Sequence, residues 1–391
     1  MKAGTVHIAV LCLLLALCGC GRNREELSFP TQPAPMLLDL NIVMPRAGET
    51  LLQEQVKELR FIMIDEATGN VEFNHTLDVS RLQPTEDSHY LYGYEQEFLT
   101  TEGWKVMYAL ANVEEQIRDI VSLPSGAEIM EGLDKLEQTE MIGSLHPDGN
   151  IPLASRKYRV KLELKTKDGT EPPVSRVKIA MVYAAVKFDL SLINNLSGEE
   201  RQDLRIVGWS INRVASQSYL IPHMDDESWL KMIEIAGNEY FGSESDPWIR
   251  NYEVPADAGH YDYVCRRNEL LILPKKPETE DNTPVHDPIM YYLHESRNMA
   301  ATSTVADEPG DQEYMFSLRV LLENMGENDN PIIFGPVKLP NLKSLVRGTH
   351  VKIEAKINKE PDAGKNGLEV RVKTWEKGDI VDDGGWEEVT E

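Results

Sequence analysis

The sequence is poor in cysteine, with four among 391 residues. Cys12 and Cys18 fall within an apolar N-terminal segment, and Cys20 closes that segment. A mature chain that begins at Cys20 keeps Cys265 as its one free thiol, so we expect no intramolecular disulfide and a fold stabilised by core burial. Cys265 fits a small buried residue better than a nucleophile.

Positive charge is also scarce, because 40 Lys and Arg stand against 65 Asp and Glu, a formal net charge of −25 at pH 7. Nucleic acids and anionic membrane surfaces both need clustered cations, so neither is an expected partner. Phosphate-loop, dinucleotide, zinc-protease and serine-hydrolase motifs are missing, and no histidine pair has metal-ligand spacing. We expect a non-catalytic protein without cofactor or metal, although Asp379, Asp382 and Asp383 imitate part of a calcium loop.

The first residues predict export. An apolar run from Ile8 to Leu17 is too short to span a bilayer and is typical of a signal peptide. It ends in Leu17-Cys18-Gly19-Cys20, a bacterial lipobox pattern in which the small Gly19 admits the peptidase and the Cys20 thiol receives the lipid. The alternative is an ordinary secretory signal that contains cysteine. We predict a signal peptide over 1–19 and an outer-membrane lipoprotein anchored through Cys20.

Alternating apolar and polar residues dominate the chain after a proline-rich tether over 20–35. In a predicted strand over 37–44, the residues on one face are apolar: Leu38, Leu40, Ile42 and Met44. Further strands are predicted over 59–64, 103–113, 158–164, 177–186, 351–357 and 368–373. One buried face and one wet face are typical of antiparallel sheets in two layers. We therefore predict an all-β fold with a few short helices and two β-sandwich domains, over 36–194 and 195–391.

Turns, helices and loops complete this prediction. Asp65–Asn70 is a hairpin candidate with Gly69 free to take positive φ. Short helices are predicted over 114–120 and 127–136, and Ser197 is a candidate helix cap. Residues 241–312, rich in Asp, Glu, Pro and Asn, predict long exposed loops. Their aromatic residues suggest an alternative function, a surface lipoprotein that binds glycan, against simple loop packing: Trp248, Tyr252, Tyr261, Tyr263, Tyr291 and Tyr292.

A basic residue follows the first predicted strand. Arg46 lies in Pro45-Arg46-Ala47-Gly48, a polar stretch in which a trypsin-like protease could bind the extended chain. An ordinary connection with a solvated Arg46 is the simpler interpretation of these residues alone.

The order of these features resembles the Bacteroidales fimbrillins, the FimA/Mfa-type subunits of type V pili. The resemblance begins with the lipobox, the spacer, a strand, an arginine and then the LRFIMIDEATGNV segment. It continues over nearly the whole mature chain in segments 106–112, 207–215, 218–221, 346–352 and 367–375. No single segment is as specific as a zinc motif, so the resemblance rests on the ordered set.

The resemblance implies two transthyretin-like β-sandwich domains and a lipidated precursor cut between Arg46 and Ala47 by an arginine-specific protease. Loss of the strand over 37–44 would open a groove that a strand of another fimbrial subunit fills. The donor implied by the resemblance lies in the tail over 379–391, whose large apolar residues are Ile380, Val381, Trp386 and Val389. They do not alternate cleanly and Gly384-Gly385 interrupts them, so an anchor or tip subunit stays an alternative to a polymerising one.

Overall fold

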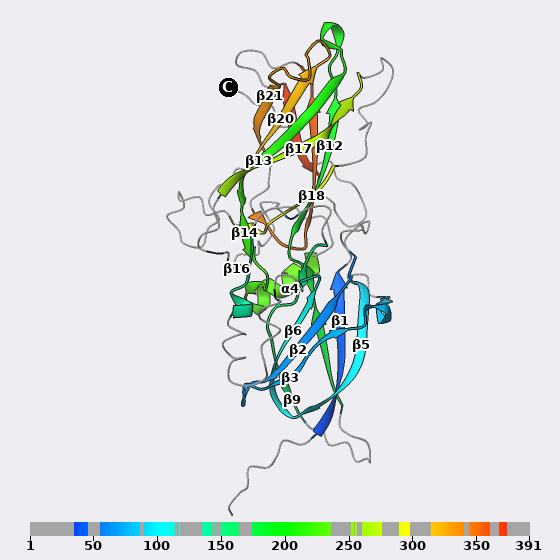
Figure 1. The fold of residues 1–391 in the computed structure, drawn as a ribbon, viewed down its shortest axis with the longest axis vertical. Coiled ribbons are helices and arrows are strands. Elements are labelled where there is room, and N and C mark those ends of the chain that lie inside the picture. Colours follow the sequence, from blue (N-terminus) through cyan, green and yellow to red (C-terminus); the bar gives the residue numbers. More distant parts are fainter. Residues whose placement is uncertain are drawn as a thin grey trace, which may run out of the picture.

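The structure is a computed structural model that describes residues 35–45, 55–86, 90–113, 117, 135–142, 145, 150–163, 174–235, 252–253, 255, 260–275, 289–297, 314–339, 344–359 and 367–373. Most of these residues are β-strand, which confirms the predicted all-β class. The helical elements among them with described bounds are α4 (Asp226–Ile235) and the 3-10 turns η2 (Val79–Arg81) and η3 (Gly198–Glu200). Figure 1 shows two β-sandwiches stacked along the longest axis, with α4 near their junction.

The N-terminal sandwich consists of two sheets, named here N1 and N2. Sheet N1 has the order β10 (Val174–Ala180), β1 (Pro35–Pro45), β5 (Tyr90–Thr101), β4 (Gln83–Pro84). Sheet N2 has the order β11 (Val182–Tyr183), β8 (Leu153–Ala154), β6 (Gly103–Ala111), β2 (Leu59–Asp65), β3 (Val71–Leu77), and β9 (Tyr158–Leu162) also pairs with β6. The strands alternate in side-chain direction, so the two inner faces share one apolar core.

The C-terminal sandwich has sheets C1 and C2. Sheet C1 has the order β18 (Ile289–Leu293), β12 (Val186–Asn194), β23 (His350–Ile357), β24 (Leu368–Lys373). Sheet C2 has the order β17 (His260–Leu273), β13 (Leu204–Ala215), β20 (Met315–Leu322), β21 (Ile332–Lys338). Three two-stranded ribbons lie outside the sandwiches: β7 (Glu140–Ile142) with β14 (Gln217–Tyr219), β15 (His223–Met224) with β16 (Tyr252–Glu253), and β19 (Ser296–Arg297) with β22 (Ser344–Leu345).

The sheets are antiparallel apart from two pairs. In sheet N1, β1 is parallel to β10 and antiparallel to β5. In sheet C1, β12 is parallel to β23 and antiparallel to β18. The prediction of purely antiparallel sheets therefore missed one parallel contact in each sandwich, because alternation within a strand does not record the direction of its neighbours.

The change from one sandwich to the other falls before β12. The apolar segment predicted as one strand over 177–186 is divided among β10, β11 and the first residue of β12. Among the described strands, β12 pairs with those of sheet C1 alone, so the connection crosses at Ala184–Ala185, not near Asn194–Asn195 as the sequence suggested. Both alanines are buried, and small side chains suit a chain that passes between two cores.

Several local predictions can be compared with the structure. The 65–70 hairpin joins β2 to β3, and Gly69 has φ +69°. Ser197 precedes η3, but its side chain makes no capping hydrogen bond. The region predicted as loops over 241–312 contains β16, β17, β18 and β19. The predicted helices over 114–120 and 127–136 lie mostly outside the described residues.

Candidate functional site

The first strand, β1, occupies an interior position in sheet N1. It hydrogen-bonds to β10 along one edge, from Leu37 opposite Val174 to Val43 opposite Ala180. It pairs with β5 along the other edge over its whole length. No described strand joins β10 directly to β5, so β1 alone connects the two parts of this sheet.

The inner face of β1 is apolar and fully buried. The side chains that point into the N-terminal core are at most 2% exposed: those predicted for this face, Leu38, Leu40, Ile42 and Met44, and in addition Met36. Burial of one such side chain stabilises a fold by about 1.5–3 kcal/mol. The core beneath them contains Phe61 and Met63 of β2 and Met107 of β6. Without β1, this core would open to water as an apolar trough.

Two polar residues in the middle of the outer face of β1, Asp39 and Asn41, hold the strand in register with both neighbours. Asp39 forms an ion pair with Arg176 of β10, with Nε and Oδ2 2.9 Å apart. The Asn41 amide donates to the Glu95 carboxylate of β5 at 3.0 Å. Both pairs join residues that lie directly opposite in the strand register. A slip of one residue would bring the polar face into the core, so the register is strongly specified.

The end of β1 is covered by α4 and by the C-terminal half of the chain. Val43, whose side chain points away from the main N-terminal core, is buried in a small cluster with Trp229 and Met232 of α4 and with Val346. The Trp229 indole donates to the Tyr158 hydroxyl at 3.0 Å, which ties α4 to β9. The last residues of β1 are therefore buried on both faces.

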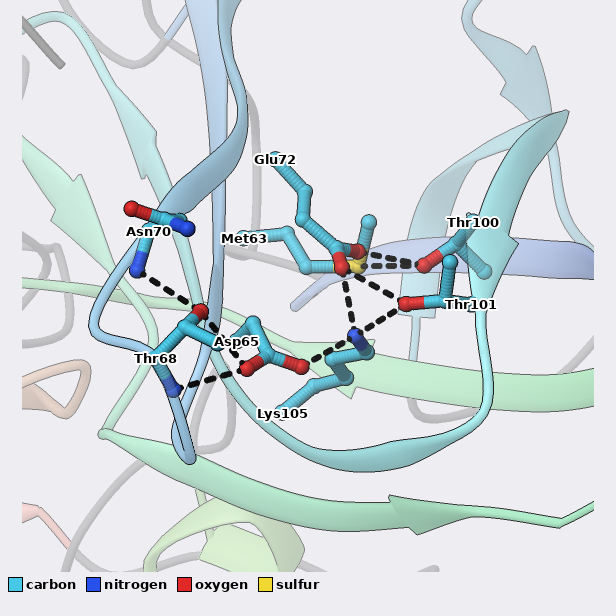
Figure 2. Close-up of polar contacts among 8 residues, drawn as sticks. All are labelled: Met63, Asp65, Thr68, Asn70, Glu72, Thr100, Thr101 and Lys105. Carbon is cyan, nitrogen blue, oxygen red and sulfur yellow. Dashed lines mark hydrogen bonds and ion pairs between the residues drawn. The ribbon is translucent and has the colours of Figure 1, made fainter. Parts of the chain in front are cut away.

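The start of β1 lies beside a buried lysine and its two carboxylate partners. Lys105 of β6 is fully buried, and its ammonium donates to Asp65 Oδ2 at 2.8 Å, to Glu72 Oε1 at 2.5 Å and to Thr101 Oγ1 at 2.9 Å. Thr100 donates to the other Glu72 oxygen at 2.6 Å. Figure 2 shows the ammonium between the two carboxylates. Thr100 and Thr101 end β5 and pair with the first two residues of β1.

This group, named here the Lys105 cluster, places one positive charge between two carboxylates. Burial by itself raises the pKa of the Asp65 carboxyl, but hydrogen bonds from Lys105 and from Thr68 outweigh burial, so the pKa lies below its ordinary value. All three ammonium protons have an acceptor, as a buried lysine requires. The cluster joins the end of β5 to sheet N2 through side chains that do not belong to β1.

A second buried ion pair joins two connections between strands of the C-terminal half. Arg347 and Glu295 are at most 1% exposed, and the guanidinium donates to both Glu295 oxygens at 3.0 and 3.1 Å. The same guanidinium donates to the carbonyls of Leu220 at 2.8 Å and Tyr219 at 2.6 Å. Tyr219 belongs to β14, whose partner β7 comes from the N-terminal half of the chain.

The structure leaves the chemically distinctive predicted residues untested. Cys20, the Arg46–Ala47 bond, the acidic residues at 379–383 and the predicted donor residues Ile380, Val381, Trp386 and Val389 all lie outside the described part of the chain. Within the described part, no helix is long and apolar enough to cross a membrane. Cys265 is in β17, opposite Trp209, and its side chain is not among those described.

The aromatic residues proposed as glycan contacts do not form one exposed surface. Tyr292 is 3% exposed and packs into the N-terminal core. Tyr291 packs edge-on against the buried Trp209, with ring centroids 5.6 Å apart. Tyr252, Tyr261 and Tyr263 lie in strands, and Trp248 lies outside the described residues. The rings of Tyr291 and Tyr292 are therefore explained by packing inside the protein, not by ligand binding.

Sequence reasoning missed α4, the Lys105 cluster and the Arg347 pair. A signal for α4 was present, since Asp225 precedes Ser228, whose backbone it caps at 2.7 Å, and Trp229 and Met232 share a face. A lone lysine at the start of the apolar run over 103–111 was a signal for a buried charge. No local pattern marks Glu295 as the partner of Arg347.

Comparison with known proteins gives structural likeness alone. No protein-family model matches the chain. No curated protein matches it either. A candidate cell adhesion protein of Parabacteroides distasonis is similar over 86% of this chain and 95% of its own, with 14% identity and a TM-score of 0.48. A fimbrial assembly protein of the same organism covers 87% and 96%, with 11% identity and a TM-score of 0.42.

The tip fimbrial protein Mfa3 of Porphyromonas gingivalis is also similar, over 87% of this chain and 98% of its own, with 12% identity and a TM-score of 0.44. These neighbours are fimbrial and adhesion-type proteins of Bacteroidales. At such identities and TM-scores the likeness concerns the course of the chain, and it assigns this protein no role.

Proposed function

We propose that this chain is a structural subunit of a cell-surface fimbria, exported as an outer-membrane lipoprotein through Cys20. In this proposal an arginine-specific protease cuts between Arg46 and Ala47, the first strand leaves, and a strand of another subunit takes its place. The observation that carries the proposal is the interior position of β1, which alone joins β10 to β5.

Strand exchange requires that the groove left by the first strand bind another strand tightly. Departure of β1 would leave two rows of unpaired backbone groups, on β10 and on β5, and an apolar trough between them. Both features favour capture of an extended segment, since backbone hydrogen bonds supply affinity and the trough selects alternate apolar side chains. An edge strand would leave only one such row.

Release of β1 also needs a cut close to its end. The strand ends at Pro45, immediately before Arg46, and the described chain resumes at residue 55 before β2. A cut at Arg46 would therefore separate all of β1 from sheet N2 while leaving β2 intact. Arg60, by contrast, lies inside β2, where a cut would disrupt the core sheet.

The first experiment treats the purified precursor with an arginine-specific protease. We expect a new N-terminus at Ala47, followed by ladders of multimers on unheated gels. The variant Arg46→Ala should stay uncut and monomeric. A chain cut at Ala47 that remains a folded monomer would contradict assembly through this groove.

The second experiment identifies the occupant. A synthetic peptide with the sequence of residues 35–45 should bind the cut chain and suppress the ladders, whereas the same peptide with Leu40→Asp should not, because it would bury a carboxylate. Deletion of residues 379–391 should abolish ladders if the C-terminal tail is the donor. Ladders that persist after this deletion would overturn the tail as donor and favour an anchor or tip role with another partner strand.

A further inference from the structure

The Lys105 cluster contains more than a simple ion pair, because a second carboxylate contacts the same ammonium. Asp65 and Lys105 lie directly opposite each other on the paired strands β2 and β6. Their charged atoms are 2.8 Å apart, and a second carboxylate, Glu72 of β3, lies 2.5 Å from the same nitrogen. An amine, a carboxyl group and a neighbouring base are thus held together by three adjacent strands (Figure 2).

We propose that Lys105 Nζ and Asp65 Cγ join in an intramolecular isopeptide bond, with Glu72 as the group that relays a proton. The product is an amide that links β2 to β6 and one released water molecule. The proposal does not depend on the proposed fimbrial function.

The atoms and charges of this step balance without a further reactant. One proton of the Lys105 ammonium passes to Asp65 Oδ2, so that a neutral amine faces a neutral carboxyl group, and the amine attacks Asp65 Cγ through its lone pair. The Nζ–Cγ bond forms, and the nitrogen gives up a second proton to Glu72, which passes it to Asp65 Oδ2. Both protons end on Asp65 Oδ2, the Cγ–Oδ2 bond breaks, and that oxygen leaves as water. Glu72 returns to its carboxylate form, and one hydrogen remains on the amide nitrogen.

The remaining oxygen of Asp65 is held where negative charge would develop. The Thr68 backbone N–H donates to Oδ1 at 2.9 Å, and the Thr68 hydroxyl donates to it at 2.8 Å. Two donors fixed on the oxygen that becomes the amide carbonyl stabilise a tetrahedral intermediate, as preorganised donors do in acyl transfer. These donors come from the β2–β3 turn, whose backbone is closed by Gly69 N–H donating to Asp65 O at 2.8 Å.

The neighbouring side chains limit the motion of the reacting groups and the access of water to Lys105. Lys105 has no exposed side-chain surface, and the side chain of Asp65 is 12% exposed. Thr100 fixes the far oxygen of Glu72, and Thr101 bridges Lys105 and Glu72. Groups held close together gain the rate advantage of an intramolecular reaction. Burial of the Lys105 ammonium favours a neutral amide over a charge, while the Glu72 side chain stays 21% exposed.

The test is the intact mass of the full purified chain after prolonged incubation at neutral pH. We expect a mass lower than that of the sequence by one water molecule. After digestion, we expect one branched peptide that contains both residue 65 and residue 105. The fully denatured chain should migrate faster on gels than a linear chain, because the bond closes a loop.

Variants separate the bond from other causes of water loss. Lys105→Met should restore the full mass. Glu72→Gln keeps both reacting side chains and should slow bond formation by at least about a hundredfold if Glu72 relays the proton. Lys161→Met, which removes an exposed lysine of β9, should leave the mass loss unchanged.

Two outcomes would overturn the proposal. Full sequence mass in the folded wild-type chain after incubation would show that the pair remains ionic. Water loss without the branched peptide would indicate cyclisation of an aspartate. If Lys105→Met fails to fold, the comparison of wild type with Glu72→Gln still decides, provided that circular dichroism shows the latter to be folded.

Discussion

Leu40 illustrates how a single side chain of β1 contributes to the core. It has no exposed surface and lies at the centre of the inner face. Leu40→Ala should lower the free energy of unfolding by about 2–5 kcal/mol, because it creates a cavity. The matched control is Leu99→Ala on β5, since Leu99 is 76% exposed. Urea denaturation measures both, and equal losses would contradict the assignment of Leu40 to the core.

Glu66 offers a test of charge at the β2–β3 turn. Arg159 Nε donates to both of its oxygens, at 2.7 and 3.0 Å, and this holds the pKa of the Glu66 carboxyl below its ordinary value of 4.5. Arg159→Gln removes the charged donor, so the pKa of Glu66 should rise towards 4.5. An NMR titration measures this change. The pKa of Asp78, which Ser80 lowers, serves as the internal reference and should not move.

Helix α4 depends on its first turn. Asp225 accepts from the Ser228 backbone N–H at 2.7 Å, which satisfies one of the free donors at the helix start. Asp225→Ala should cost about 1 kcal/mol of stability, whereas Asp225→Asn keeps the accepting oxygen and should cost only a fraction of that. Thermal unfolding compares the two variants. Equal destabilisation by both would mean that the charge of Asp225, not its capping bond, matters.

The sequence was sufficient to predict those strands whose alternation is regular. Most of the inner face of β1 could be named residue by residue, because Asp39 and Asn41 alternate with its apolar residues and such alternation is a local pattern. The parallel neighbour β10 could not be predicted, since it comes from far along the chain and pairing direction leaves no local trace. The segment over 177–186 is apolar on both faces and therefore hid two strand breaks.

The polar parts of the candidate site were harder to predict for a physical reason. A buried charge is stable only with partners, and the partners of Lys105 come from β2, β3 and β5. The lysine could raise the question of a buried charge, but only the three-dimensional arrangement identifies Asp65 and Glu72. The same holds for Arg347, whose acceptors come from two separate segments, Tyr219–Leu220 and Glu295.

The buried Arg347–Glu295 pair joins two connections of the C-terminal half to the end of β14. Arg347→Met should cost about 3–5 kcal/mol, because it leaves a buried carboxylate without its partner. Adding Glu295→Leu to the same chain should restore part of that loss, so the double variant should be more stable than the sum of the single effects predicts. Chemical denaturation of all four proteins measures the coupling. Additive losses would contradict a direct interaction.

The two sandwiches share an arrangement that the sequence did not reveal as a repeat. The first strand of each, β1 or β12, lies between one parallel and one antiparallel neighbour. The two strands differ in how the chain connects them to the rest of the molecule. Since β12 continues directly from β11 at its start, it is covalently connected to the N-terminal sandwich, whereas only β1 has a candidate cleavage point at its end.

The mixed pairing of β1 has a geometric consequence. An occupant that reproduces its hydrogen bonds must run in one direction only, parallel to β10 and antiparallel to β5. A contact in which one copy gives a segment and the next receives it is head-to-tail, and it builds an open filament unless the rotation between copies closes a ring. A filament built in this way would be polar, with an unfilled receptor at one extremity and an unused segment at the other, and each extremity would then need its own terminating subunit.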